Sequence, residues 1–167
     1  VSLTQDVEGN TTTYTYDTDG NKLTETDAQS NVTTFTYDIN GNVKTESRNR
    51  TLANAGVVTE TTLYDYDALN RVTRTTYADG TFSTVEYDAV GNQIATEDQS
   101  GQRTEYGYDV YGRLLLTTCL DATTSSSTYD EEGNKLTDTG RNGYTTSYTY
   151  DVLNRFCRLY KSYDAEE

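Results

Sequence analysis

The chain alternates short stretches in which every second residue is aromatic or β-branched with short polar stretches that contain Gly, Asn and Asp. Tyr14-Thr15-Tyr16, for example, places two rings on one face of an extended segment, because successive side chains of a strand point to opposite faces. Lys22 to Thr26 alternates in the same manner. These patterns predict half-buried β-strands, and no stretch has the period of an α-helix. The polar stretches between them predict hairpin turns.

Tyr-Asp pairs recur along the chain at an almost constant interval. They are Tyr16-Asp17, Tyr37-Asp38, Tyr66-Asp67, Tyr87-Asp88, Tyr108-Asp109, Tyr129-Asp130 and Tyr150-Asp151. The successive steps are 21, 29, 21, 21, 21 and 21 residues, and the long step is one repeat with an insertion. Such a period indicates a repeat array in which each repeat packs against its neighbours. We therefore expect residues 1–167 to form seven tandem repeats of about 21 residues, with an 8-residue insertion near residues 49–60.

The position four residues after each paired Tyr is restricted to Gly and Asn. It holds Gly20, Gly41, Asn70, Gly91, Gly112, Gly133 and Asn154. These residue types tolerate a positive φ. A type I turn followed by one left-handed residue is a common hairpin connection, and an Asp that begins a turn can accept a hydrogen bond from the backbone two residues on. We predict such a turn after every Tyr-Asp pair.

A second turn follows the second strand of each repeat. Its members lie at Val7–Asn10, Asp27–Asn31, Ala78–Thr81, Gln99–Gln102 and Arg141–Tyr144. One repeat is thus a β-hairpin plus a turn, and seven repeats predict about fourteen antiparallel strands in meander order. We interpret the insertion, from Asn49 to Glu60 with a tip at Asn54-Ala55-Gly56, as a hairpin extension. A binding loop is the alternative.

The composition agrees with strands and excludes several classes of protein. Leu, Ile, Val and Phe make up about 17% of the residues and the net charge is −14, which is typical of disorder. Sixteen Tyr and 33 Thr in a strict period argue for a folded β-protein instead. Thirteen scattered Lys and Arg residues argue against nucleic-acid binding, and no stretch is apolar enough to insert in a membrane. Because Val1 lies within a repeat, we expect a fragment of a longer protein.

The cysteine and histidine content indicates neither a disulfide framework nor a zinc site. His is absent, which removes the commonest general base and metal ligand. Cys119 and Cys157 are too few for a disulfide framework and lack zinc spacing. In a meander they lie four strands apart, about 19 Å at ~4.8 Å per strand. We therefore predict that they are not bonded to each other.

Other candidate residues have a simpler structural explanation. Asp17 to Asn21 and Asp38 to Asn42 suggest calcium loops, but Gly stands at the fourth position and no Glu at the twelfth, so turns are favoured. Glu131-Glu132 and Glu166-Glu167 are interpreted as solvated charges, and Ser125-Ser126-Ser127 has no His partner. We predict no catalytic, cofactor-binding or metal-binding residue, and no enzyme activity.

The chain also has repeated Tyr positions and three N-glycosylation patterns. A Tyr repeated at one strand position is more often a packing ladder than a stacking site for sugars or bases. Three segments match the acceptor pattern for N-glycosylation, and chance matches are expected in a chain rich in Thr. They begin at Asn10, Asn31 and Asn49. These three remain meaningful only if the source organism glycosylates proteins.

The repeat resembles the YD repeat of RHS-type proteins. The motif Tyr-x-Tyr-Asp-x-x-Gly-Arg/Asn-Leu is best preserved at Tyr106 to Leu114 and at Tyr148 to Phe156, and the resemblance extends over the whole chain. The first and sixth repeats have Lys22 and Lys135 where Leu is usual, and the sixth has Ser127 in place of the first Tyr. The resemblance implies long antiparallel sheets that coil into shells, which enclose a toxin in bacterial members and belong to adhesion ectodomains in teneurins.

The expected fold is accordingly all-β, an antiparallel β-hairpin array that forms the coiling sheet of a shell or a solenoid-like fibre. The resemblance implies a structural segment of a large secreted or cell-surface protein whose shell wall encloses or carries a cargo such as a C-terminal toxin domain. An extracellular adhesion or filament-forming protein is the alternative. Implied partners are neighbouring repeats of the same or identical chains, a toxin cargo, and a cell-surface or glycan partner. The chain has no Pro, so the Pro-rich self-cleaving segment of bacterial members is not in it.

Overall fold

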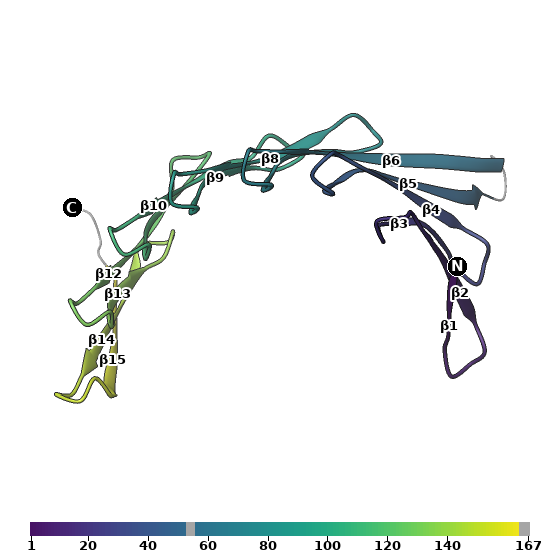
Figure 1. Cartoon of the computed structure of the whole chain (residues 1–167). Coiled ribbons are helices and arrows are strands. Elements are labelled where there is room, and N and C mark those ends of the chain that lie inside the picture. Colours follow the sequence, from purple (N-terminus) through teal and green to yellow (C-terminus); the bar gives the residue numbers. More distant parts are fainter. Residues whose placement is uncertain (53–55, 164–167) are drawn as a thin grey trace. The chain divides into compact units, whose positions relative to one another are not determined.

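Fifteen antiparallel β-strands make up the computed structural model, which describes residues 1–52 and 56–163 (Figure 1). Each strand is hydrogen-bonded to the next along the chain, so the sheet order is the sequence order. The described residues contain no helix, and hence none that could cross a membrane. The strands are β1 (Ser2–Gln5), β2 (Thr11–Tyr16), β3 (Lys22–Thr26), β4 (Val32–Tyr37), β5 (Val43–Leu52), β6 (Gly56–Tyr66), β7 (Val72–Thr76), β8 (Phe82–Tyr87), β9 (Gln93–Glu97), β10 (Arg103–Tyr108), β11 (Leu114–Cys119), β12 (Thr124–Tyr129), β13 (Lys135–Thr139), β14 (Tyr144–Tyr150) and β15 (Phe156–Tyr163).

The chain divides into two compact parts, residues 1–84 and residues 85–167. Each part is an antiparallel β-meander. The all-β antiparallel fold expected from the sequence is confirmed, with fifteen strands in place of about fourteen because β1 precedes the first complete repeat.

Thirteen turns within the described residues share one backbone geometry. The first residue donates its N–H to the carbonyl of the fifth, and the fourth donates its N–H to the carbonyl of the first. The fourth residue has a positive φ in every one of them. Gly112, for example, has φ +78° and Asn70 has φ +60°. The predicted hairpin turn with a left-handed Gly or Asn is therefore confirmed after all seven Tyr-Asp pairs.

The two faces of the sheet carry different side chains. Thr15 and Thr24 lie opposite each other across β2 and β3, and their hydroxyl oxygens are 2.7 Å apart. Thr36 and Thr45 repeat this pairing across β4 and β5 at 2.6 Å. We call this side the threonine face. The opposite side carries the rings of the Tyr-Asp strands, and we call it the tyrosine face.

A bulge next to six of the Tyr-Asp pairs sets which side chains meet on the tyrosine face. In the first repeat the pairing register shifts between Thr15 and Tyr16, so that Tyr16 lies opposite Lys22. The same shift recurs before Tyr108 and Tyr150. As a consequence Tyr148 and Tyr150 both contact the ring of Phe156 edge-on, with ring centroids 6.3 and 6.1 Å away. Extra residues in one strand re-aim side chains in this manner.

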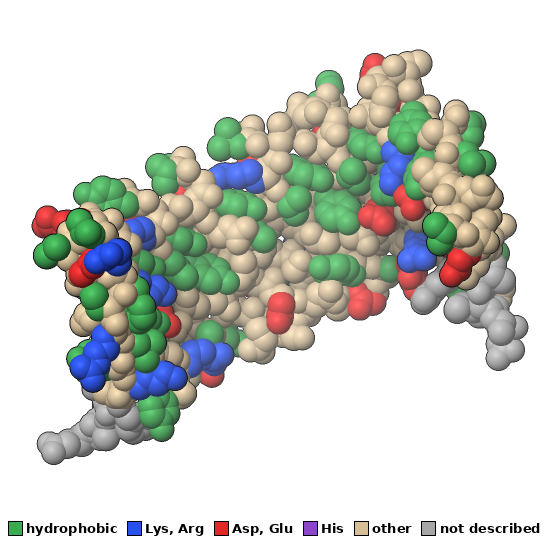
Figure 2. Space-filling model, turned by 90° about the horizontal axis from the view of Figure 1, so that it is seen from below, with side chains coloured by type: hydrophobic (Ala, Val, Ile, Leu, Met, Phe, Trp, Pro, Cys, Tyr) green, Lys and Arg blue, Asp and Glu red, His purple; other side chains and the backbone are tan. Residues whose placement is uncertain are grey.

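The sheet has almost no enclosed interior. Ala95 is the single buried hydrophobic side chain among the described residues. Hydrophobic groups are spread over the surface among acidic and basic ones (Figure 2). A single layer cannot be stabilised by a core of fully buried side chains. Cross-strand pairs and hydrogen bonds between neighbouring repeats must supply the stability instead.

The segment expected to contain the insertion forms the longest hairpin. β5 and β6 are 10 and 11 residues long, whereas the strands that follow them are shorter. They pair in register from Thr45 with Leu63 to Leu52 with Gly56. Asn54 and Ala55 of the expected tip lie outside the described residues. The division of the chain into seven repeats with this insertion stays a prediction.

Candidate functional site

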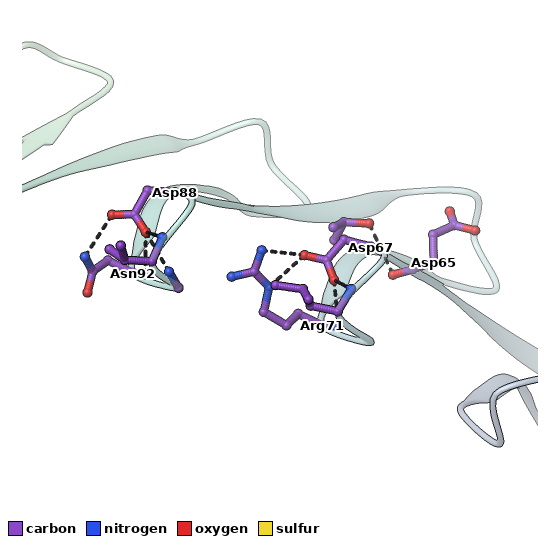
Figure 3. Close-up of polar contacts among 9 residues, drawn as sticks. Asp65, Asp67, Arg71, Asp88 and Asn92 are labelled. Carbon is purple, nitrogen blue, oxygen red and sulfur yellow. Dashed lines mark hydrogen bonds and ion pairs between the residues drawn. The ribbon is translucent and has the colours of Figure 1, made fainter.

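The aspartate of each Tyr-Asp pair holds the turn that follows it. In the turn 88–92, Asp88 Oδ1 accepts the N–H groups of Val90 and Asn92, both at 2.9 Å. Its Oδ2 accepts the side-chain amide of Asn92 at 2.8 Å. Figure 3 shows Asp88 directed at Asn92. The N–H of Gly91 also donates to Oδ1 at 2.7 Å. One carboxylate therefore satisfies four donors of its own turn, and we call this arrangement the aspartate clamp.

Arginine takes the place of the amide in other repeats. Asp67 Oδ2 accepts the Nε–H of Arg71 at 2.7 Å, and a second guanidinium nitrogen lies 2.6 Å away (Figure 3). Asp151 and Arg155 form the same pair at 2.7 Å. Two parallel bonds to a carboxylate suit the planar guanidinium. The residue four positions after the Asp is thus Asn or Arg because both can donate to the second carboxylate oxygen.

These hydrogen bonds lower the pKa of the clamp carboxylates. The side-chain amide of Asn92 is the largest cause of the lowered pKa of Asp88, and backbone N–H groups of the turn add to it. Asn21 and Asn134 lower the pKa of Asp17 and of Asp130 in the same manner. Hydrogen bonds to the charged form of a carboxyl group favour that form.

The tyrosines of five Tyr-Asp pairs bind the preceding repeat. Tyr37 donates its hydroxyl to the carbonyl of Lys22 at 2.7 Å, and Tyr108 donates to the carbonyl of Gln93 at 2.9 Å. The acceptor always lies six residues after the Tyr of the preceding pair, at the start of its second strand. The other such bonds run from Tyr66 to Val43, from Tyr129 to Leu114 and from Tyr150 to Lys135. The pair thus divides two tasks: Asp orders its own turn and Tyr ties one repeat to the previous one.

Some turns are also joined to each other. Asn42 donates its amide to Asn70 Oδ1 at 2.8 Å, and Asn134 donates to Asn154 Oδ1 at 3.1 Å. Asn70 and Asn154 are the two Tyr-Asp turn positions with positive φ that are not Gly. An Asn side chain there gains a partner that Gly lacks, and this bond offsets the strain of the left-handed backbone.

A comparison with known protein families finds the same repeat in part of the chain. The family model described as RHS Repeat matches residues 87–124, which contain the Tyr87-Asp88 and Tyr108-Asp109 pairs. The same turn and hydroxyl geometry continues on both sides of that segment. The chain thus contains RHS repeat sequence at residues 87–124 and is similar to RHS/YD-repeat proteins. A search of curated proteins found no match.

Solved structures with the same fold are Tc toxin complexes. The chain is similar to a crystal structure of TcdB2-TccC3-Cdc42, with 21% identity and a TM-score of 0.73 over 92% of this chain. It is also similar to the Photorhabdus luminescens Tc holotoxin pore, with 21% identity and a TM-score of 0.74 over 94% of this chain. In both cases it spans 9% of the length of the matched chain. At this identity the likeness establishes the fold, which supports a structural repeat segment.

The RHS/YD repeat explains the residues that suggested calcium. Asp17 and Asp38 use both carboxylate oxygens on their own turns, accepting the amides of Asn21 and Asn42 and backbone N–H groups. No group of three or more His, Cys, Asp or Glu suited to a metal occurs in the described ranges. The prediction that these segments are turns is confirmed, and the absence of metal, catalytic and cofactor residues stays a prediction.

The other predicted candidates are spread over the repeats. Glu131 and Glu132 are exposed in the turn after Tyr129, whereas Glu166 and Glu167 lie outside the described residues. Ser127 of β12 donates to Asp138 Oδ1 at 2.8 Å. Cys119 and Cys157 are free thiols, so the prediction that they are not bonded to each other is confirmed.

Two of the glycosylation patterns coincide with clamped amides. Asn10 donates its amide to Asp6 at 2.8 Å, and Asn31 donates to Asp27 at 2.8 Å. Asn49 accepts the hydroxyl of Thr59 at 2.6 Å. A glycan on Asn10 or Asn31 would remove a donor that the turn uses.

The lysines at degenerate positions form ion pairs on the tyrosine face. Lys22 Nζ lies 2.7 Å from Glu25 and 4.5 Å from the ring centre of Phe35. Lys135 Nζ lies 3.0 Å from Asp138, which also accepts the Ser127 hydroxyl. Hydrogen bonding to the acid raises the pKa of each Lys. An acid three residues after each Lys is the sequence signal for these pairs.

Sequence reasoning missed features that depend on the register. Arg103 bridges Glu86 at 2.7 Å and Glu105 at 3.1 Å on the threonine face of residues 85–167. Ser30 and Ala122 adopt positive φ in the second class of turn, at +65° and +62°. Neither residue type signals a left-handed position, so the signal there was the repeat period alone.

Proposed function

We propose that this chain is part of the wall of a large secreted or cell-surface protein, and that the wall encloses or carries a cargo such as a C-terminal toxin domain. The observation that supports the proposal best is the tyrosine bond between repeats. Because five of the repeats donate this bond to the repeat before them, the sheet grows by whole hairpins and needs no enclosed core. The role is structural and not catalytic.

The fold of the Tc toxin chains adds support at the level of architecture. Those chains are much longer than this one, so a segment of this size contributes only part of any enclosure. An open single layer with one face of rings and one of hydroxyl groups suits a wall with two different environments. We propose that one of these two faces is turned to the enclosed cargo and the other to the outside of the wall.

Limited proteolysis of the full-length gene product tests the proposal. We expect the segment that follows the repeats to resist protease while the sheet is folded. It should become sensitive when acid or a destabilising repeat substitution such as Gly112→Val opens the sheet. Equal digestion in the folded and opened states would contradict an enclosed cargo. Fibres seen by electron microscopy would favour the adhesion or filament alternative instead.

A further inference from the structure

One edge of the C-terminal part, residues 85–167, carries a row of exposed apolar side chains. They occupy the second and third positions of the turns that follow the Tyr-Asp pairs. Val90, Val110, Tyr111, Val152 and Leu153 are each at least 70% exposed. In a meander these turns all lie at the same ends of the strands, about 10 Å apart because two strands separate them. We call this row the apolar rim.

The turn itself does not require apolar residues there. In the turn after Tyr129 the same positions hold Glu131 and Glu132, and its backbone bonds are the same as in the other turns. The opposite edge of this part holds mainly polar tips, with Gln99-Ser100 and Arg141-Asn142. The apolar rim is therefore a property of one edge, and exposed apolar side chains gathered on one edge mark an interaction site.

The rim contains both a hollow and a projecting tip. A hollow of about 750 Å³ lies between the turns 88–92 and 109–113 and is lined in part by Val90, Ile94, Val110 and Tyr111. The tip Val152-Leu153 projects from the same edge two turns further on. The spacing is held by side-chain bonds, since Arg113 donates to the carbonyl of Asp130 at 2.9 Å and Asn134 donates to Asn154.

We infer that the apolar rim binds a second copy of this chain, with the Val152-Leu153 tip of each copy seated in the hollow between the turns 88–92 and 109–113 of the other. Such a contact is self-complementary and closes as a two-fold dimer. If each of the five side chains loses roughly 100 Å² of exposed surface, two copies bury on the order of 1,000 Å², the lower limit for a specific interface. The inference does not depend on the proposed wall function.

The charge of the chain limits the affinity of this dimer. Each copy has a net charge of −14, and Glu131 and Glu132 interrupt the rim between the hollow and the tip. Two acidic copies repel each other, and salt screens that repulsion. We therefore expect a weak dimer, with a dissociation constant on the order of micromolar, that tightens as salt is added.

Sedimentation velocity over a range of concentrations tests the dimer. We expect the unmodified chain to dimerise reversibly. The tip variant Val152→Ser/Leu153→Ser and the hollow variant Val110→Ser/Tyr111→Ser should each weaken the dimer by about tenfold or more. Leu120→Ser, at an exposed turn on the opposite edge, is the matched control and should leave the dissociation constant unchanged. Circular dichroism verifies that each variant retains its strands.

Two further measurements, one on a mixture of variants and one on a rim-filling variant, test the same contact. A mixture of tip and hollow variants should dimerise more tightly than either alone, because one intact tip then meets one intact hollow. Glu131→Val/Glu132→Leu should tighten the dimer by filling the gap in the rim. A chain that stays monomeric at all concentrations overturns the inference. A dimer that the rim variants leave unchanged also overturns it, since association would then run through β1 or β15.

Discussion

Two classes of turn in this molecule share a backbone and differ in what their side chains do. The Tyr-Asp turns begin with Asp in all seven cases, and that carboxylate binds the third and fifth residues of its turn. The connecting turns, which lie at 6–10, 27–31, 77–81, 98–102, 119–123 and 140–144, begin with Asp in only three cases. Both classes nevertheless have the same two backbone bonds and a left-handed fourth residue.

The connecting turns show that the carboxylate can come from the first or from the third residue of the turn. Tyr77 and Cys119 begin two of them, and in these Asp79 and Asp121, at the third position, accept the N–H of the fifth residue instead. The backbone geometry thus depends on the left-handed residue and tolerates either placement of the carboxylate. What distinguishes the Tyr-Asp turns is the preceding Tyr, whose hydroxyl in five of them donates to the preceding repeat.

Acid should produce the largest effect, because it acts on every clamp at once. The folded-state pKa values of the clamp carboxylates, such as Asp17, Asp88 and Asp130, are lowered from 3.8 by their hydrogen bonds. A lowered folded-state pKa means that the stabilisation is complete above the unfolded pKa and is lost as pH falls through the folded one. We expect urea midpoints to be constant above about pH 5 and to fall steeply below pH 4. A midpoint that rises on acidification would contradict the clamp.

Gly112→Val tests the feature that the two turn classes share. Gly112 has φ +78°, and its nearest neighbour to an added Cβ is 3.5 Å away, so the penalty comes from backbone strain and not from a clash. A β-branched residue in this region costs on the order of 1–3 kcal/mol. We expect a clear loss of stability by thermal denaturation. Thr117→Val in β11 is the control and should change the melting temperature little.

Asp109→Ala and Asp98→Ala compare the two classes directly. Asp109 accepts the N–H groups of Tyr111 and Arg113 and also pairs with the Arg113 guanidinium. Asp98, in a connecting turn, accepts the N–H groups of Ser100 and Gln102. We expect both variants to melt earlier and Asp109→Ala to lose more, because it also removes the ion pair with the Arg113 guanidinium. Equal losses would mean that the side-chain partner contributes nothing.

Ala122→Gly should give the smallest effect, and it should stabilise. Ala122 holds φ +62° in a connecting turn, a conformation that costs an Ala about 1 kcal/mol or more. Gly removes that strain but adds entropy to the unfolded chain, roughly 0.5–1 kcal/mol, so the net gain is a few tenths of a kcal/mol. The reverse change, Gly101→Ala, should destabilise. The urea midpoint should therefore rise in Ala122→Gly and fall in Gly101→Ala.

The sequence predicts the parts of this fold that depend on local chemistry. Gly and Asn four residues after each Tyr signal the left-handed turns, and Asp signals their hydrogen bonds, because each effect acts within five residues. The acceptor of Tyr108, the carbonyl of Gln93, lies 15 residues away and depends on a bulge that shifts the register. Ser30 and Ala122 could not be identified as left-handed because the turn overrides their preference. The placement of the Tyr rings on one face followed from strand alternation, but the placement of Phe82 beside Arg74 did not.

The central claim is that Tyr ties a repeat to the preceding one while Asp orders its own turn, and hydrogen exchange tests it most directly. In Tyr108→Phe, which removes one hydroxyl bond of about 0.5–1.5 kcal/mol, we expect faster amide exchange in β9 and β10 with the turn 109–113 still protected. In Asp109→Ala we expect the reverse, with exchange faster within 109–113 and little changed in β9. Tyr111→Phe, whose hydroxyl has no hydrogen-bond partner in the described part of the chain, serves as the control. The same exchange pattern in Tyr108→Phe and Asp109→Ala would contradict the division of tasks.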